Sequence, residues 1–221
     1  MIWIGDSIVS IKEKCLLIQE ELQKLYPTTE TFLHFNTDWQ LLFAVILSAQ
    51  ATDNSVNEAT ERMFKELPEL TDYNENNRLL IHDCVKKVGL GNSKTEYLLK
   101  TAKILIDEYS GIVPRDRKIL QTFPGVGYKT SGVVLAEFYN DPYIPVDTHV
   151  YRVTHRLGIV KNISPDDTEK RLEKLFTVPS NIHLHRQFIL FGREICKARN
   201  EECQLCPFKD ICNYYQKKKP K

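Results

Sequence analysis

The segment FPGVGYKT, residues 123–130, places a lysine directly behind a tight turn that contains Gly125 and Gly127. Lys129 falls in the first turn of the helix that we expect to follow, where the helix dipole disfavours a positive charge. Partial burial, which we also expect, would disfavour the charge further. An uncharged amine can form a Schiff base, so Lys129 is the candidate nucleophile. A lysine that contacts phosphate or solvent is the alternative.

Asp147, in the segment PVDTHVYRV (145–153), is the candidate catalytic carboxylate. It precedes an expected helix, where it could act as an N-cap by accepting backbone N–H bonds from His149 or Val150. The same carboxylate could stabilise a cationic sugar as a base–sugar bond breaks, or orient an attacking amine. His149 could serve as an acid or base, with a structural histidine as the alternative.

The residues around the glycine turn predict a helix-hairpin-helix. A short helix is expected over 117–122, and a second helix begins near Tyr128. Glycines at 125 and 127 let backbone N–H groups approach a phosphate beside a helix N-terminus, while Val126 can anchor the turn in the core. Such a turn grips a nucleic-acid backbone without reading its sequence. A turn that binds nothing is the alternative.

Four of the six cysteines lie close together near the C-terminus, with the spacing C-x6-C-x2-C-x5-C. They are Cys196, Cys203, Cys206 and Cys212. Four thiolates can bind either one tetrahedral zinc ion or a [4Fe-4S] cluster. Zinc ribbons normally use two CxxC pairs, and only one such pair is present, so the spacing favours the cluster and leaves zinc as the alternative.

The composition is that of an ordinary globular protein: 221 residues, 42% hydrophobic and 27% charged, with a formal net charge of +1. This charge does not by itself indicate a nucleic-acid binder, although a local basic face could be present. The N-terminus lacks the features of a secretory signal, and the longest apolar run, residues 41–47, is too short to span a membrane. We therefore expect a cytoplasmic protein with reduced thiols, in which Cys15 and Cys84 only pack.

Apolar residues recur at helical spacing and no stretch alternates convincingly like a strand, which predicts an all-α fold. Helices are expected from Ile8 to Tyr26 and over 41–47, 56–64, 79–88, 93–109, 117–122, 129–138, 148–157, 165–176 and 183–196. Asp38 is the expected cap of the second helix. The loop 139–147, which contains two prolines, is the candidate domain junction, with a plain interhelical loop as the alternative.

Together these motifs resemble endonuclease III, the iron–sulfur DNA glycosylase and abasic-site lyase of base-excision repair. FPGVGYKT is similar to that family's LPGVGRKT, VDTH (146–149) to its aspartate motif, and the cysteine spacing to its cluster signature. The segments LLFAVILSAQATDNSVN (41–57) and VGLGNSKTEYL (88–98) resemble two further family blocks. The resemblance covers nearly the whole chain and keeps the motifs in order.

The resemblance implies two helical domains with a DNA groove between them. Residues 31–141 would form a six-helix barrel that carries the hairpin, and residues 1–30 plus 142–221 would form the domain that binds the [4Fe-4S] cluster. The protein would act as a monomer on double-stranded DNA that contains damaged bases or abasic sites, with no membrane partner. In a prokaryote it would be associated with the nucleoid.

The resemblance also implies roles for single residues, with Lys129 as nucleophile and Asp147 as catalytic carboxylate. Gln50 would fill the gap left by an extruded nucleotide, and Leu90 would wedge into the base stack. The implied DNA contacts are Gln50, Leu90, Gly125, Val126, Gly127, Lys197 and Arg199. Without the resemblance, Gln50 would be interpreted as a polar residue at a helix end and Leu90 as a core residue.

The implied reaction removes an oxidised pyrimidine and then cleaves the strand by β-elimination through a lysine Schiff base. The alternatives are a mismatch- or pyrimidine-dimer-specific glycosylase of the same superfamily and a non-catalytic DNA-binding protein. Three departures from the family pattern bear on DNA affinity and lesion range. Tyr128 replaces an arginine, Phe123 replaces a leucine, and Glu201 and Glu202 offset the basic residues of the cysteine loop.

Overall fold

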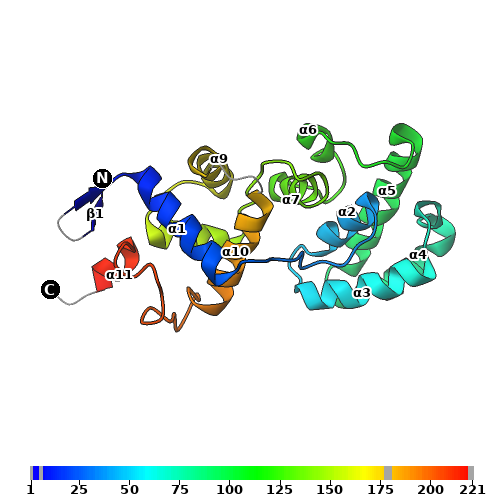
Figure 1. The fold of residues 1–221 in the computed structure, drawn as a ribbon. Helices are drawn as coiled ribbons and strands as arrows, with labels where there is room; N and C mark the ends of the chain where they lie inside the picture. The colour runs from blue at the N-terminus through cyan, green and yellow to red at the C-terminus, as the bar shows by residue number, and fades with distance from the viewer. Residues whose placement is uncertain (1, 5–6, 177–180, 219–221) are drawn as a thin grey trace. The chain divides into compact units, whose positions relative to one another are not determined.

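The computed structural model describes residues 2–4, 7–176 and 181–218 (Figure 1). The chain divides into two compact units, Thr31–Tyr139 and Met1–Glu30 together with Asn140–Lys221. The second unit is therefore built from both ends of the chain. The boundary between Tyr139 and Asn140 falls within the loop expected as the junction.

The unit of residues 31–139 contains six α-helices. They are α2 (Asp38–Leu47), α3 (Asp53–Glu66), α4 (Arg78–Val85), α5 (Gly91–Tyr109), α6 (Arg117–Leu120) and α7 (Tyr128–Tyr139). Short 3-10 turns lie at Leu70–Asp72, Glu75–Asn77 and Lys86–Val88. Every residue of α2 from Trp39 to Leu47 is buried, and this helix contacts α3, α5 and α7. The apolar run of the sequence thus forms the core of this unit.

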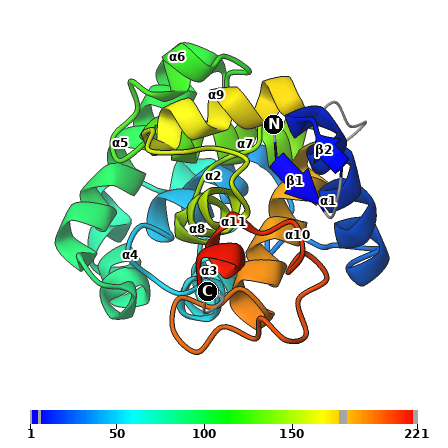
Figure 2. The same ribbon diagram turned by 90° about the vertical axis from the view of Figure 1, so that its left-hand side faces the viewer.

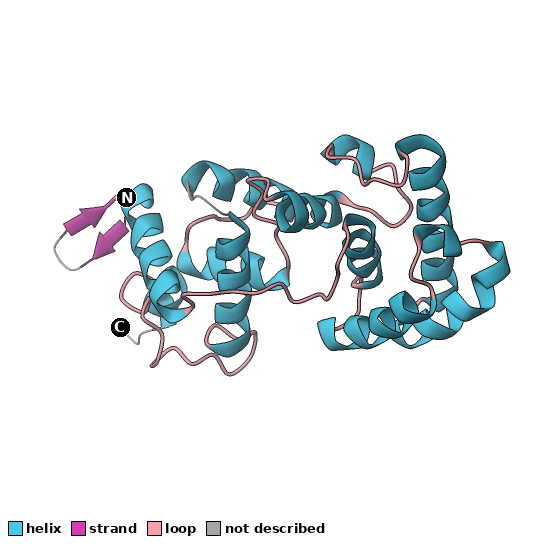
Figure 3. Cartoon of the chain, turned by 45° about the vertical axis from the view of Figure 1, so that its right-hand side comes forward, coloured by secondary structure: helices cyan, strands magenta, loops and turns pink. Residues whose placement is uncertain are grey.

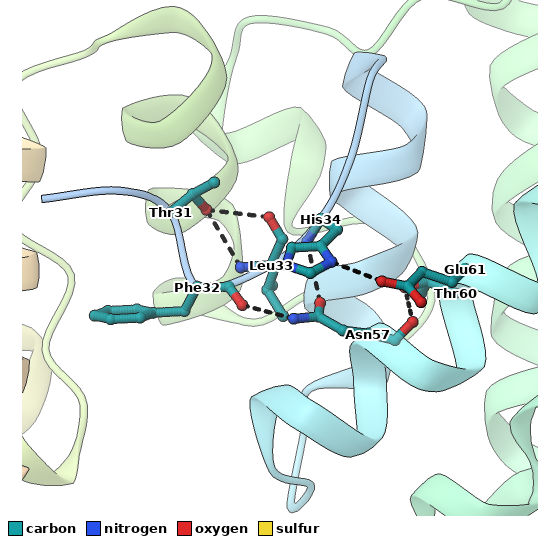
Figure 4. Close-up of polar contacts among 7 residues, drawn as sticks. All are labelled: Thr31, Phe32, Leu33, His34, Asn57, Thr60 and Glu61. Carbon is teal, nitrogen blue, oxygen red and sulfur yellow. Dashed lines mark hydrogen bonds and ion pairs between the residues drawn. The ribbon is translucent and has the colours of Figure 1, made fainter.

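The segment that enters this unit is tied to α3 by Asn57 (Figure 4). Its side-chain Oδ1 accepts the backbone N–H of His34 at 3.0 Å, and its Nδ2 donates to the carbonyl of Phe32 at 3.0 Å. His34 Nδ1 lies 2.9 Å from Glu61 Oε1 one turn further along the helix. These bonds satisfy the backbone of a segment that has no regular structure of its own.

The other unit contains α1 (Ile11–Leu25), α8 (Thr148–Leu157), α9 (Pro165–Leu175), α10 (Asn181–Glu194) and α11 (Asn213–Lys218). Helices α8 and α10 pack closely together (Figure 2). A side chain at Gly192 on α10 would place its Cβ 2.9 Å from Cβ of His149, so glycine permits the close approach of the two helices.

Lys14 joins α1 to the C-terminal part of this unit. The lysine is fully buried, and its Nζ donates to the Leu157 carbonyl and lies 3.3 Å from Asn213 Oδ1. Burial disfavours the charged amine and lowers its pKa to about 8. The neighbouring Cys15 is also buried, as is Cys84 in the other unit, which agrees with the prediction that both pack in the interior.

The helical fold class is confirmed, but two local expectations were wrong and one helix was missed. The first helix begins at Ile11, because residues 2–4 and 7–9 form an antiparallel hairpin, seen in magenta in Figure 3, with Ile2 opposite Val9. Ser10 and Glu13 then form a capping box that starts α1.

The cap of α2 is Thr37, whose side chain accepts the N–H of Gln40, and not Asp38. Asp38 is the first helical residue, and its carboxylate accepts the N–H of Val113 at 2.7 Å.

Helix α11 was not expected, since NYYQKK is short and lacks a periodic apolar pattern. No helix of the described part of the chain is long and apolar enough to cross a membrane.

Candidate active site and cysteine pocket

The glycine turn between α6 and α7 has the form expected of a hairpin. Phe123 and Val126 are buried, and the Val126 N–H donates to the Phe123 carbonyl at 3.1 Å. Gly125 has a φ of 77°, and a Cβ there would lie 2.6 Å from the ring of Tyr97. A Cβ at Gly127 would meet nothing within 4 Å. Gly125 is therefore required by the fold, whereas Gly127 leaves its backbone open to another molecule.

Lys129 lies in the first turn of α7 and is exposed. Its position at the helix N-terminus agrees with the expectation, but the expected partial burial was wrong. The buried part of α7 runs from Ser131 to Ala136, so the helix reaches the core only beyond the lysine. The amine is open to a ligand that approaches the glycine turn.

Tyr128, beside the lysine, is half-buried and is held by α6. The guanidinium of Arg117 lies over its ring, and an N–H of the same group donates to the Tyr128 carbonyl. The residue that departs from the family arginine therefore has an arginine stacked on it. This pair was not predicted from the sequence, because the two residues lie on different helices.

Gln50 and Leu90 both adopt the left-handed backbone conformation, with φ of 57° and 53°. Both are exposed, and 59% of Leu90 is accessible to solvent. Asparagine and glycine tolerate this conformation, but for Gln and Leu it costs on the order of 1–3 kcal/mol. The interpretation of Leu90 as a core residue is therefore wrong. Strain of this kind concentrates at functional sites.

Asp147 is the N-cap of α8, as predicted. Its Oδ1 accepts the backbone N–H groups of His149 and Val150, both at 2.8 Å. Among the described residues no hydrogen bond to Oδ2 is present. One carboxylate oxygen thus holds the helix, and the other is available for chemistry.

His149 is half-buried, and its Nδ1 lies 3.2 Å from a guanidinium nitrogen of Arg152. Burial is the main cause that lowers the pKa of the imidazole, which favours its neutral form. A neutral ring beside an arginine, packed against Gly192, is typical of a structural histidine.

The four clustered cysteines line one pocket, together with Arg156, Leu157, Phe191 and Tyr214 among others. Within the described ranges, no three His, Cys, Asp or Glu side chains are arranged to hold a metal ion. Four thiolates that line one pocket are the ligand set of a [4Fe-4S] cluster, in which each thiolate binds a different iron.

Two arginines one turn apart on α8 hold the cysteine loop. Arg152 Nε donates to the Cys196 carbonyl at 2.9 Å, and Arg156 donates to the carbonyls of Lys197 and Ala198 at 2.6 and 3.2 Å. Arg156 also lies 3.6 Å from the sulfur of Cys196. Neither arginine was singled out from the sequence, although their spacing places both on one face of a helix.

Of the two expected phosphate contacts in this loop, Arg199 is exposed, whereas Lys197 is half-buried and its Nζ lies 3.3 Å from Glu202. Glu201 is engaged elsewhere, because Lys218 and the Tyr214 hydroxyl both donate to it. These donors lower the pKa of Glu201 to about 2. Glu202 therefore offsets the positive charge of Lys197, while Glu201 fixes α11 to the loop.

Comparison with known proteins agrees with this geometry. Residues 43–177 match the family model of HhH-GPD superfamily base excision DNA repair proteins, and residues 196–212 match that of the iron–sulfur binding domain of endonuclease III. Endonuclease III of Rickettsia conorii is 42% identical over 198 residues, which are 90% of this chain and 94% of that protein. The enzyme of Escherichia coli K12 is 38% identical over 206 residues, 93% and 98% of the two chains.

Solved structures extend the comparison. A trapped endonuclease III–DNA covalent intermediate is 36% identical, with a TM-score of 0.88 over 95% of this chain and 99% of that one. A non-covalent endonuclease III–DNA complex has the same TM-score and identity, and 98% of its chain is covered. A thermostable thymine-DNA glycosylase is 24% identical with a TM-score of 0.84, which shows a shared fold alone.

Fold, hairpin and cysteine segment together define a base-excision DNA repair protein of the helix-hairpin-helix superfamily. Within it, this chain belongs to the endonuclease III family and is a bifunctional DNA glycosylase and abasic-site lyase with a [4Fe-4S] cluster. The matches favour this activity over a mismatch or dimer specialist and over a non-catalytic DNA-binding protein.

Proposed function

We propose that this enzyme acts as a monomer on double-stranded DNA, removes oxidised pyrimidines and cleaves the resulting abasic site, with Lys129 as nucleophile. The observation that carries the proposal is the exposed amine of Lys129 at the N-terminus of α7, next to the open backbone of Gly127. A relative that is 36% identical was solved as a trapped covalent intermediate with DNA, which supports a covalent step.

The hairpin grips the DNA backbone near the reacting sugar. The backbone N–H groups of Gly125 and Gly127 and the N-terminus of α7 attract a phosphate, and no side chain at Gly127 blocks its approach. Arg199 adds a second phosphate contact from the cysteine loop, and Lys197 contributes less because Glu202 lies beside it. Both contacts are independent of sequence, as a lesion-searching enzyme requires.

Recognition requires the damaged nucleotide to leave the stack, which costs a few kcal/mol and less at a lesion. Gln50 fills the vacated space, and Leu90 wedges between the bases as an exposed apolar side chain. Inserted apolar wedges of this type unstack neighbouring bases and kink the duplex.

The reaction has two stages, release of the base and cleavage of the strand. The neutral amine of Lys129 attacks C1′ of the flipped sugar, the C1′–N bond breaks, and the base leaves with a proton from solvent or from the amine. The sugar ring then opens to a protonated Schiff base, loss of a C2′ proton follows, and the bond to the 3′ phosphate breaks. Asp147 stabilises positive charge on the sugar through Oδ2, while Oδ1 keeps α8 capped.

Four cysteines would hold the cluster, and they are Cys196, Cys203, Cys206 and Cys212. When bound, the cluster supplies a rigid link among these positions. Arg152 and Arg156 fix the intervening backbone, so that Arg199 is presented from a loop with defined geometry.

Borohydride trapping tests the proposal. Wild-type protein should become covalently joined to duplexes that contain an oxidised pyrimidine or an abasic site, and Lys129→Gln should abolish the adduct. Lys118→Gln, which removes an exposed lysine on the helix before the turn, is the matched control and should still be trapped. An adduct that persists in Lys129→Gln would show that another amine reacts.

A panel of duplexes tests the lesion class, since oxidised pyrimidines should be cleaved faster than thymine mismatches or pyrimidine dimers.

Metal analysis tests whether the four cysteines bind an iron–sulfur cluster. Purified protein should be brown and contain about four irons per chain, and replacement of Cys203 by serine should lower the iron content. Colourless protein with one zinc per chain would contradict the assignment.

A further inference from the structure

The two loops that carry Gln50 and Leu90 are joined by one buried ammonium group. Lys94, on α5, is 2% exposed. Its Nζ donates to the Ala49 carbonyl at 2.9 Å and to the Val88 carbonyl at 2.8 Å. Ala49 directly precedes Gln50, and Val88 lies two residues before Leu90. Lys94 therefore bonds to the backbone of both loops next to their left-handed residues.

This position is unfavourable for a cation. Lys94 lies near the N-terminus of α5, where the helix dipole opposes positive charge, and burial lowers the pKa of its amine. A buried cation is tolerated only when hydrogen bonds replace its hydration. An apolar side chain of similar length would fill the same space without that requirement. The distinctive property of lysine here is its ability to donate to two carbonyls from segments far apart in the sequence.

The two loops need such support because both contain a strained residue. Gln50 and Leu90 persist in the left-handed conformation only where their surroundings determine the backbone. The Leu90 loop is also packed tightly, since a Cβ at Gly91 would lie 2.9 Å from Cα of Lys86. Lys94 is the group that ties this loop to the Gln50 loop.

We propose that Lys94 is a positioning residue that holds Gln50 and Leu90 at a fixed separation, so that both side chains enter the duplex together when a base is extruded. The inference rests on the proposed function of these two residues and adds a third residue that touches neither DNA nor the reacting atoms. Lys94 therefore acts on duplex opening and not on the Schiff-base chemistry.

The test compares one reaction in two substrates. An abasic sugar in a single strand has no helix to leave and no partner strand opposite it, whereas the same sugar in a duplex must rotate out of the helix and leaves a gap opposite the unpaired base. Lys94→Met should lower kcat/KM for cleavage of the duplex site by about 10- to 100-fold, because small misplacement of positioning groups has effects of this size. Cleavage of the single-stranded site should remain within about twofold of wild type.

Lys100→Met is the matched control, since Lys100 lies exposed on the same helix. It should leave both reactions unchanged. A base analogue such as 2-aminopurine, placed beside the lesion, gives an independent readout. Its fluorescence rises when the stack opens, and Lys94→Met should reduce the rise.

Equal losses on the two substrates, or no loss on the duplex, would overturn the inference. Should Lys94→Met fail to fold, Lys94→Arg keeps the charge while changing the geometry of the donors, and the same comparison applies. A loss confined to the duplex supports the proposal, and an equal loss contradicts it. Absence of single-strand cleavage and of borohydride trapping in the wild type would instead overturn the proposed function.

Discussion

The Arg117 guanidinium stacks on the ring of Tyr128, with its central carbon 3.6 Å from the ring centroid, and donates to the Tyr128 carbonyl at 2.8 Å. Tyr128 occupies the position that is usually arginine in the family, directly before Lys129. The stack holds a guanidinium from α6 against the residue that precedes the nucleophile.

This stack predicts energetic coupling between the two residues. Tyr128→Leu, Arg117→Ala and the double variant form a thermodynamic cycle, and the coupling free energy should be about 1 kcal/mol, typical of a partly exposed cation–π pair. Urea unfolding of the four proteins measures it. Additive effects of the two single substitutions would show that the contact contributes nothing to stability.

Alanine substitutions at the two glycines of the hairpin should affect different properties: stability at Gly125 and DNA binding at Gly127. Gly125→Ala should lower the free energy of unfolding by about 1–3 kcal/mol, because φ is 77° and the ring of Tyr97 occupies the space of a Cβ. Gly127→Ala should leave stability within about 1 kcal/mol of wild type but weaken binding to undamaged duplex, since the added methyl group meets an approaching phosphate. Thermal melts and salt titrations of binding distinguish the two. Unaltered DNA affinity in Gly127→Ala would mean that no phosphate approaches this turn.

The divided use of the Asp147 carboxylate predicts that capping and catalysis can be separated. Asp147→Asn keeps an oxygen for the N–H groups of His149 and Val150, so the free energy of unfolding should change by less than about 1 kcal/mol. Glycosylase activity should nevertheless fall by about 100-fold, because the negative charge is lost. Asp147→Ala should lose the cap as well, with a further loss of about 1 kcal/mol in stability. An active Asp147→Asn variant would restrict this residue to its structural role.

The buried amine of Lys14 predicts a pH dependence of stability. Its pKa is about 8 in the folded protein and 10.5 ordinarily, so between these pH values the unfolded chain binds more protons than the folded one. The free energy of unfolding therefore rises as pH increases from about 8 toward 10.5, by on the order of 2 kcal/mol. Below pH 8 both states hold the proton and this contribution to the slope vanishes.

Urea unfolding at pH 8 and pH 10 measures this contribution. Lys14→Met should flatten the rise, while Lys12→Met, at an exposed position on the same helix, should retain it. Identical slopes in both variants would show that Lys14 is solvated in the folded protein.

Much of the site could be predicted from residue types and spacing. The glycine turn, the aspartate before a helix and the spacing of the four C-terminal cysteines each lie within a short segment. The role of each could therefore be predicted without knowledge of the tertiary fold. The apolar run 41–47 likewise predicted a buried helix, and every residue of that run is buried.

Features that depend on tertiary packing could not be predicted in this way. Leu90 is apolar yet exposed, because the left-handed backbone turns it away from the core. Lys129 is exposed because α7 becomes buried only from Ser131 onward. The Lys94 contacts join segments that no sequence pattern relates to one another.

Lys14 and Asn213 are 199 residues apart in the chain, which has a consequence for how the protein is made. On the ribosome, α1 emerges first, but its buried face of Cys15, Ile18 and Leu22 has no partner until the last third of the polypeptide is translated. At about 5–20 residues per second, the nascent helix waits on the order of 10–40 s. Residues 31–139 are complete well before then, so we expect the later-formed half to be the one that needs chaperone protection during synthesis.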